Sequence, residues 1–177
     1  MIQWQRHLQS TKVSNDRKEA ERGRELLATV RHAAMATVNE DGTPHNTPFY
    51  YLVDDAREHI YLASSPDAVH SQNIARTGQA FVVIYQAGQG SGLYLQAENA
   101  HEITDESELQ QGLKVWNANR AEEGKPPLAA DFFAGDSPQR MYKFDLVRYY
   151  VNHSEKDTAG NILRDIRTEI TREDLLK

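Results

Sequence analysis

The sequence predicts a mainly β protein in which six antiparallel strands form a small closed or split barrel with helical lids. Strand-length segments rich in β-branched and aromatic residues follow one another across short turns, which parallel strands could not use. Two longer connections instead show the spacing of amphipathic helices. The 177 residues fit one domain, with a leading helix over 16–31, the barrel over 33–152 and a C-terminal extension over 153–177.

The strand predictions rest on apolar runs and on alternation, bounded by turn residues such as Asp41-Gly42, a strong hairpin signal. From 93 onward, for example, small and apolar side chains alternate with larger polar ones. The predicted strands cover 34–38, 47–53, 59–63, 80–85, 93–103 and 140–151.

Helix boundaries are predicted from capping residues. The leading helix has Ser14 or Asn15 as a candidate cap, and a short helix follows Ser65 as its cap and runs to about Arg76. A capping box beginning at Asp105 predicts a longer helix that ends near residue 124.

The C-terminal segment allows two interpretations. The turn residues at 157–161 favour a hairpin in which 162–170 returns as a strand. Isoleucines recurring every fourth residue in the same segment also suit a helix.

Composition limits the class of protein. Hydrophobic residues make up 39% and charged residues 26% of the chain, as in globular proteins, and there is no apolar run long enough to span a bilayer. The N-terminal residues lack the apolar stretch of a secretory signal, and the chain has no cysteine. A net charge of -6 argues against a nucleic-acid surface. We therefore expect a cytoplasmic protein that binds neither nucleic acid nor membrane.

Five segments stand in a specific order and spacing along the chain. They are AAMATV at 33–38, GTPHNTPFYY at 42–51, IYLASS at 60–65, AVHSQNI at 68–74 and GLYLQAENA at 92–100. Together they resemble the FMN-binding split-barrel family, typified by pyridoxamine 5′-phosphate oxidase. The resemblance covers roughly residues 26–103, and more faintly 140–152.

The resemblance implies a homodimer that holds flavin mononucleotide (FMN) in two sites, each built from both subunits. The second strand would lay its backbone along the isoalloxazine ring, at Asn46, Thr47, Pro48, Phe49 and Tyr50. The third strand and the following helix would hold the phosphate, at Leu62, Ala63, Ser64, Ser65, Val69, His70 and Ser71. The partner subunit would add a residue near the flavin, Tyr149 or Tyr150.

The residue types in the phosphate segment suit an anion. Ser64, Ser65 and Ser71 offer hydroxyls, and a helix N-terminus offers amide groups. His70 can donate to phosphate at a position where relatives in the family commonly carry lysine or arginine. Phosphate binding could therefore be weaker or pH-dependent, and Asp67 would repel the anion unless it faces away. An ordinary capped surface helix with an exposed histidine is the alternative.

Three consecutive aromatic residues, Phe49, Tyr50 and Tyr51, cannot all face the barrel core, because side chains alternate along a strand. We expect at least one of them to be covered by a cofactor or by the partner subunit. Core packing and dimer contacts are the alternative interpretation of these residues.

Other motifs carry little weight. The glycine-rich segment 88–92 lies between predicted strands and lacks the spacing of a phosphate loop, so we interpret it as a turn. The seven histidines show no paired metal-ligand spacing, and no metal site is predicted. A nucleophile elbow is absent from the sequence. Trp116 is predicted to be core packing rather than a flavin contact.

The expected function is that of a flavin-dependent oxidoreductase acting on a small, unidentified substrate. Pyridoxamine phosphate oxidase activity itself is not expected, because 93–100 carries no Lys or Arg and 162–176 does not match the terminal motif of such enzymes. No catalytic side chain is nominated, since hydride transfer occurs at the flavin ring. The alternatives are a non-enzymatic, stress-related flavin binder, or a relative that binds a deazaflavin or haem, or no ligand.

Overall fold

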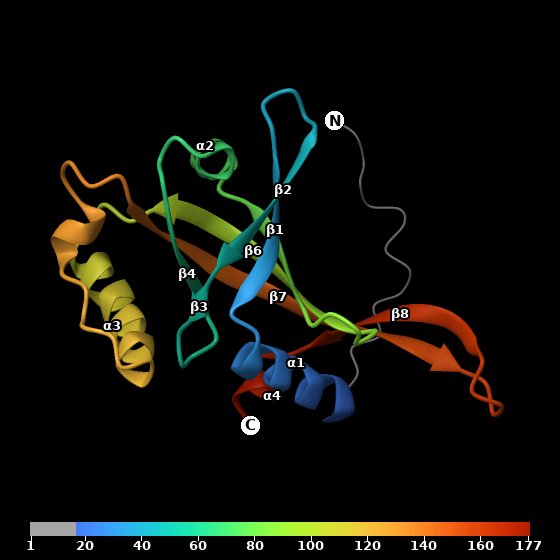
Figure 1. The fold of residues 1–177 in the computed structure, drawn as a ribbon. Helices are drawn as coiled ribbons and strands as arrows, with labels where there is room; N and C mark the ends of the chain where they lie inside the picture. The colour runs from blue at the N-terminus through green and yellow to red at the C-terminus, as the bar shows by residue number, and fades with distance from the viewer. Residues whose placement is uncertain (1–16) are drawn as a thin grey trace.

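The computed structural model describes residues 17–177 and contains one antiparallel sheet of eight strands (Figure 1). The expected mainly β class is confirmed. The strands are β1 (His32–Val38), β2 (Pro44–Tyr50), β3 (Leu52–Val53), β4 (His59–Ser64), β5 (Ala80–Tyr85), β6 (Gly92–Glu102), β7 (Arg140–Lys156) and β8 (Ile162–Ile170). The helices are α1 (Arg17–Thr29), α2 (Val69–Thr77), α3 (Glu106–Glu122), the 3₁₀ turn η1 (Ala130–Phe133) and α4 (Arg172–Leu176).

The sheet curls because its two ends are joined by a single residue. The strand order is β2-β1-β5-β6-β7-β4-β3, and only Tyr51 separates β2 from β3. The Tyr51 amide donates to the Arg31 carbonyl at 3.3 Å, and there the chain changes partner from β1 to β4. The predicted strand 47–53 is therefore two strands. With β8 added, the count is eight rather than six.

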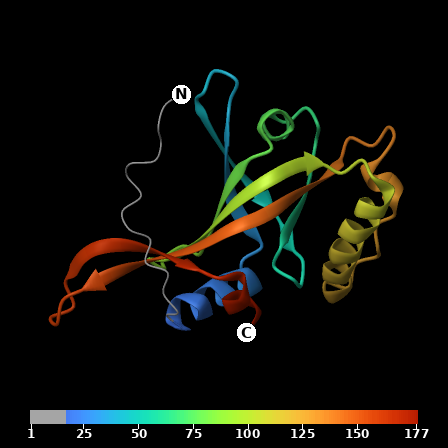
Figure 2. The same cartoon turned by 180° about the vertical axis from the view of Figure 1, so that it is seen from behind.

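Helices close the ends and one side of the barrel (Figures 1 and 2). Helices α1 and α4 lie at one end and α2 lies at the other, while α3 and η1 lie beside β4 and β7. Most of the buried apolar side chains form one cluster inside the barrel, and a smaller cluster joins α3 and η1 to the outside of β4 and β7. Within residues 17–177, every helix is too short or too polar to cross a membrane.

Alternation along the strands separates an inner from an outer face. On β6, Leu93, Leu95 and Ala97 are buried, while the residues between them are partly exposed. The strand register aligns one outward residue from each of five neighbouring strands. We call these residues the outer row: Pro48, Ala34, Val83, Tyr94 and Tyr150.

The short helix begins later than predicted. Its first residue is Val69, its N-cap is Ala68, and Ser65 lies before it in a turn where its hydroxyl accepts from the Asp67 amide at 3.3 Å. The prediction of Ser65 as the helix cap is therefore wrong. The Ser65 carbonyl accepts from the Ala68 amide, so a separate turn precedes the helix.

The longer helix begins as predicted, but its capping box is half formed. The Asp105 carboxylate accepts from the Glu108 amide at 2.9 Å. The Glu108 side chain turns instead toward His101 and Lys143, which lie on β6 and β7. A tertiary ion pair thus replaces the local hydrogen bond.

The C-terminal residues extend the sheet as a hairpin that projects beside the barrel (Figure 1). Strand β7 continues beyond residue 152, and 162–170 forms the hairpin partner β8 rather than a helix. Helix α4 then returns to α1, where an ideal Cβ on Gly23 would lie 2.9 Å from Leu175. The leading helix is described from Arg17 to Thr29, and its predicted caps Ser14 and Asn15 lie outside the described residues.

Candidate functional site

Three side chains near the N-terminus of α2 form a hydrogen-bonded cluster at one end of the barrel. The Ser64 hydroxyl lies 2.7 Å from His70 Nε2, and the Ser71 hydroxyl donates to Ser64 Oγ at 3.3 Å. Ser64 and Ser71 are buried, whereas His70 is half-buried. We call Ser64, His70 and Ser71 the serine–histidine cluster; it brings together three residues of the predicted phosphate segment.

The helix that carries this cluster has free donors. Its N-cap, Ala68, has no side-chain oxygen, and no side chain of the described residues caps the helix. The amides of the first helical turn have no carbonyl partner within the helix, so they carry partial positive charge. Asp67 is exposed and precedes the helix. The cluster therefore combines hydroxyls, an imidazole and backbone N–H groups, which is a donor set suited to a phosphate.

The basic residue within the cluster is a histidine, His70. Burial, and then the neighbouring charge of His45 on β2, lowers the pKa of His70 below its usual value. Arg140 pairs with Ser64 in the sheet, but its guanidinium donates to the carbonyls of Gly135, Ser137 and Gln139. The carbonyls of the loop before β7 thus accept the hydrogen bonds of Arg140, the arginine that pairs with Ser64 in the sheet.

The five residues predicted to line the flavin ring face different surroundings. Asn46 and Pro48 are exposed on the outer face, while Thr47 and Phe49 point inward and Phe49 joins the core. Tyr50 also points outward, but α3 covers it. The Tyr50 hydroxyl accepts from Asn119 at 2.8 Å, and its ring lies 5.8 Å from that of Trp116.

The expectation for the aromatic triplet is met in part. Phe49 and Tyr51 are core residues, and Tyr50 faces away from the core, as alternation requires. Its cover is a helix of the same chain. Trp116 packs against the smaller apolar cluster, and its indole N–H is buried with no partner among the described residues.

The remaining predicted residues also differ in exposure. Leu62 lies in the core, Ala63 packs toward α3, and Val69 is exposed on α2. Tyr149 points inward and donates to the Arg57 carbonyl at 2.6 Å, whereas Tyr150 lies in the outer row. Of the two tyrosines, only Tyr150 therefore faces outward, and it is buried within its own chain, where its hydroxyl accepts from Arg148 at 3.4 Å.

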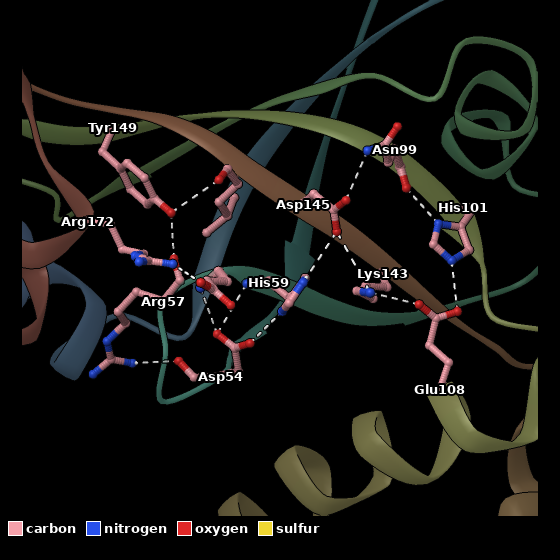
Figure 3. A network of polar contacts seen from close by, with 12 residues as sticks. Asp54, Arg57, His59, Asn99, His101, Glu108, Lys143, Asp145, Tyr149 and Arg172 are labelled. Carbon is pink, nitrogen blue, oxygen red and sulfur yellow. Dashed lines mark hydrogen bonds and ion pairs between the residues drawn. The ribbon is translucent and has the colours of Figure 1, made fainter.

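A second polar network extends from β4 across β7 to α3 (Figure 3). No pattern in the sequence predicted this network. His59 Nδ1 lies 2.6 Å from Asp54 and its Nε2 lies 3.5 Å from Asp145. Lys143 then pairs with Glu108 at 2.8 Å. These residues are separated by up to about ninety positions in the chain, so no local motif joins them.

The far end of the network holds a coupled pair. Burial acts to lower the pKa of His101, but hydrogen bonds to the Glu108 carboxylate and the Asn99 carbonyl outweigh it and raise the pKa. Burial acts to raise the pKa of Glu108, and its bonds to Lys143 and His101 lower it. Asn99 has a left-handed backbone, with φ of 48°, where the ladder between β6 and β7 is irregular.

The network borders an open cavity of about 550 Å³. His59, Asp145 and Tyr149 line one side, and Glu169 and Arg172 line the other. Charges of both signs face this space, and Arg172 pairs with Glu58. The cavity thus has no uniform charge that would select an anion or a cation.

Solved structures with similar folds include a protein related to general stress protein 26 from Clostridium acetobutylicum, with 14% identity and a TM-score of 0.61 over 87% of this chain and 96% of that one. A heme-binding protein from Mycobacterium smegmatis has 18% identity and a TM-score of 0.60, over 89% of this chain and 60% of that one. HutZ, the heme storage protein from Vibrio cholerae, has 17% identity and a TM-score of 0.58, over 74% of this chain and 92% of that one.

No curated protein matches the sequence. The family model described as pyridoxamine 5′-phosphate oxidase matches residues 20–152. This match spans the barrel from the leading helix through most of β7 and covers well over half of the chain. The protein therefore belongs to the pyridoxamine 5′-phosphate oxidase family.

Proposed function

We propose that this protein is an FMN-binding oxidoreductase that works as a homodimer and acts on a small, unidentified substrate. The observation that carries the proposal is the serine–histidine cluster beside the uncapped N-terminus of α2. Family membership supports a flavin as the ligand. The cluster would hold the phosphate of FMN through hydroxyl, imidazole and amide donors.

The outer row supports a site completed by a second copy. Strands are about 4.8 Å apart, so Pro48 and Tyr150 of one chain lie about 19 Å apart across four strand spacings. Along β7, ten residues separate Arg140, next to Ser64, from Tyr150, which corresponds to about 33 Å. One chain cannot bring Tyr150 to its own cluster. In this proposal, Tyr150 of a second copy approaches the flavin.

The outer row also fits burial against another chain. Its members are apolar or aromatic, and at its β2 end Pro48 is exposed, as is Asn46 on the same strand, while Tyr150 at the other end is already buried within its own chain. An apolar sheet face of this kind is typical of a protein interface. The ring of a flavin bound between two such faces would be shielded from water.

Bound FMN would supply the redox chemistry by accepting a hydride at its ring. The protein would bind the phosphate, orient the ring along β2 and exclude water from it. The described residues supply no side chain to which we assign proton transfer.

Haem is the second candidate ligand, and the names of two structural neighbours favour it, since one is described as heme-binding and the other as a heme storage protein. A histidine would be the natural axial ligand. A stress-related flavin binder without turnover is a further form of the first proposal, supported by the neighbour related to general stress protein 26.

A visible spectrum of the purified protein, measured after separate additions of FMN and haem, tests the proposal. Bound flavin should absorb near ~370 and ~450 nm, whereas bound haem gives a Soret band. Steady oxidation of NAD(P)H by the FMN-loaded protein would support the enzyme over the passive binder. Retention of haem but not of FMN through gel filtration would contradict the proposal.

A further inference from the structure

We infer that His70, which has His45 as a neighbour on β2, supplies the positive charge of the proposed phosphate site, so that FMN binding takes up a proton. This inference rests on the proposed function and concerns how the same site is regulated. It starts from the accessible nitrogen of His70. One ring nitrogen, Nε2, is held by Ser64 at 2.7 Å, while Nδ1 has no partner among the described residues.

The cluster holds Nε2 of His70 in place and leaves Nδ1 available for a ligand. Ser71 donates to Ser64, so the Ser64 oxygen can accept from His70 Nε2–H when the ring is protonated. Protonated His70 would then present Nδ1–H to the phosphate. Neutral His70 can also place its single N–H on Nδ1, with the Ser64 hydroxyl donating to Nε2, so protonation adds positive charge to the site rather than an extra hydrogen bond to the phosphate.

Other charged groups around α2 do not replace this histidine. On β7, Arg140 is held by three loop carbonyls and pairs with Glu102 of β6 at 3.4 Å. Arg76, at the far end of α2, donates to Val38 and Asn73. Asp67, before the helix, is an acidic residue, and burial raises the pKa of Tyr142 on β7 further above its usual value, so neither adds positive charge.

His45 lies on the inward-facing side of β2, together with Phe49, and its charge opposes that of His70. In the free protein this opposition and the burial of His70 both favour a neutral ring. A bound phosphate reverses the balance, because its negative charge favours protonation of the His70 ring. Binding of the anion and binding of the proton are therefore coupled, and each strengthens the other.

The test is the dissociation constant of FMN between pH 6.5 and 8.5 at fixed ionic strength, with riboflavin as a ligand that lacks the phosphate. The FMN constant should rise by about threefold to tenfold per pH unit between the pKa of His70 in the free protein and its higher pKa in the complex, because one proton is taken up in that range, and it should level off above the second value. The riboflavin constant should change much less. The upper part of this range avoids the phosphate's own titration near pH ~6.

Variants separate the two histidines from general effects. His70→Gln should remove most of the pH dependence, and His45→Gln should reduce it. His32→Gln is the matched control, since it removes an exposed histidine from the other end of the same hairpin, where His32 pairs with Tyr50. This control should keep the wild-type slope.

The outcomes distinguish the two proposals. FMN binding with a flat pH profile, or with a slope that His70→Gln leaves intact, would overturn the inference while leaving FMN binding in place. Failure to bind FMN at any pH would overturn the proposed function and the inference with it. Circular dichroism of each variant shows whether it is folded, and a folded His70→Gln variant is sufficient for the test.

Discussion

His153 Nδ1 lies 2.9 Å from a carboxylate oxygen of Glu19, and this polar contact holds the leading helix against β7. The Glu19 side chain is only 9% exposed. His153 Nε2 also lies 3.2 Å from the Thr168 hydroxyl on β8, so one imidazole joins three elements. The leading helix is therefore held by a specific polar contact as well as by its apolar side.

Replacing this histidine should weaken the fold. His153→Ala leaves a buried carboxylate without its partner, which should lower the free energy of unfolding by about 1–3 kcal/mol. Urea denaturation measures the change. Adding Glu19→Gln to the variant should recover part of the loss, because an amide costs less to bury than a charge. A loss below about 0.5 kcal/mol would contradict this role.

The tight contact between α3 and the sheet predicts a second destabilising substitution. An ideal Cβ on Gly112 would lie within 3.2 Å of the Tyr61 ring and would clash with the fully buried Met141. Gly112→Ala should therefore lower stability by about 1–3 kcal/mol. The higher helix propensity of alanine would by itself raise stability by about 1 kcal/mol. A net loss of stability would therefore show that the steric clash outweighs helix propensity.

Gly23→Ala is the matched comparison for this substitution. Its added Cβ meets the ends of the Leu175 and Ile170 side chains at 2.9 and 3.2 Å, and these can rotate. We expect a smaller loss than at Gly112 in the same thermal unfolding assay. An equal or larger loss at Gly23 would contradict the close packing of α3.

The barrel could be predicted from the sequence because its signals are local. Alternation on 93–103 and the apolar run at 80–85 correspond directly to β6 and β5. The break at Tyr51 has no local signal, because it depends on a change of pairing partner between β1 and β4. The start of α2 was missed because Pro66 and Ser65 also suit the turn that precedes it.

Only part of the candidate site could be predicted from the sequence, because some of its contacts are local and others are tertiary. Ser64, His70 and Ser71 are close in sequence, and the structure brings them together. The contribution of His45 and the occupation of Arg140 depend on tertiary contacts. The Figure 3 network joins residues from five elements, β4, β6, β7, α3 and α4, so sequence spacing could not reveal it.

His70→Ala should weaken FMN binding at pH 7 by about 1–3 kcal/mol, as expected for a lost hydrogen bond to a charged group. Isothermal titration or flavin fluorescence quenching measures the affinity. Gln72→Ala is the control, since Gln72 is exposed on the same helix outside the cluster. Unchanged FMN affinity in a folded His70→Ala variant would mean that the phosphate binds elsewhere.

The pair of His101 and Glu108 predicts a pH dependence of stability. Because the folded-state pKa of His101 is raised, its contribution is fully present below the unfolded value near pH ~6.5 and is lost as the pH rises through the higher folded value. Glu108 has a lowered pKa, so its contribution is present above pH ~4.3 and is lost as the pH falls through the lower folded value.

Thermal unfolding from pH 6 to pH 9 checks the His101 contribution. The melting temperature of His101→Asn should decline less over this range than that of the wild type. The difference should be small, because the His101 side chain is 44% exposed and solvent screens the pair. A steeper decline in the variant than in the wild type would contradict the assigned direction.

Charge placed in the outer row should separate the subunits of the proposed dimer. Ala34 lies between Pro48 and Val83 in the row and is only partly exposed, so Ala34→Glu would bring a carboxylate into the interface without entering the barrel core. Sedimentation equilibrium should show the wild type as a dimer and the variant as a folded monomer near 20.1 kDa.

The same experiment with Ala118→Glu, on an exposed position of α3, controls for the added charge. That variant should remain dimeric. FMN affinity should fall with dissociation of Ala34→Glu, because the partner's half of the site is lost. A wild-type protein that sediments as a monomer at micromolar concentration would exclude a site built from two chains, and FMN would then have to bind within one barrel.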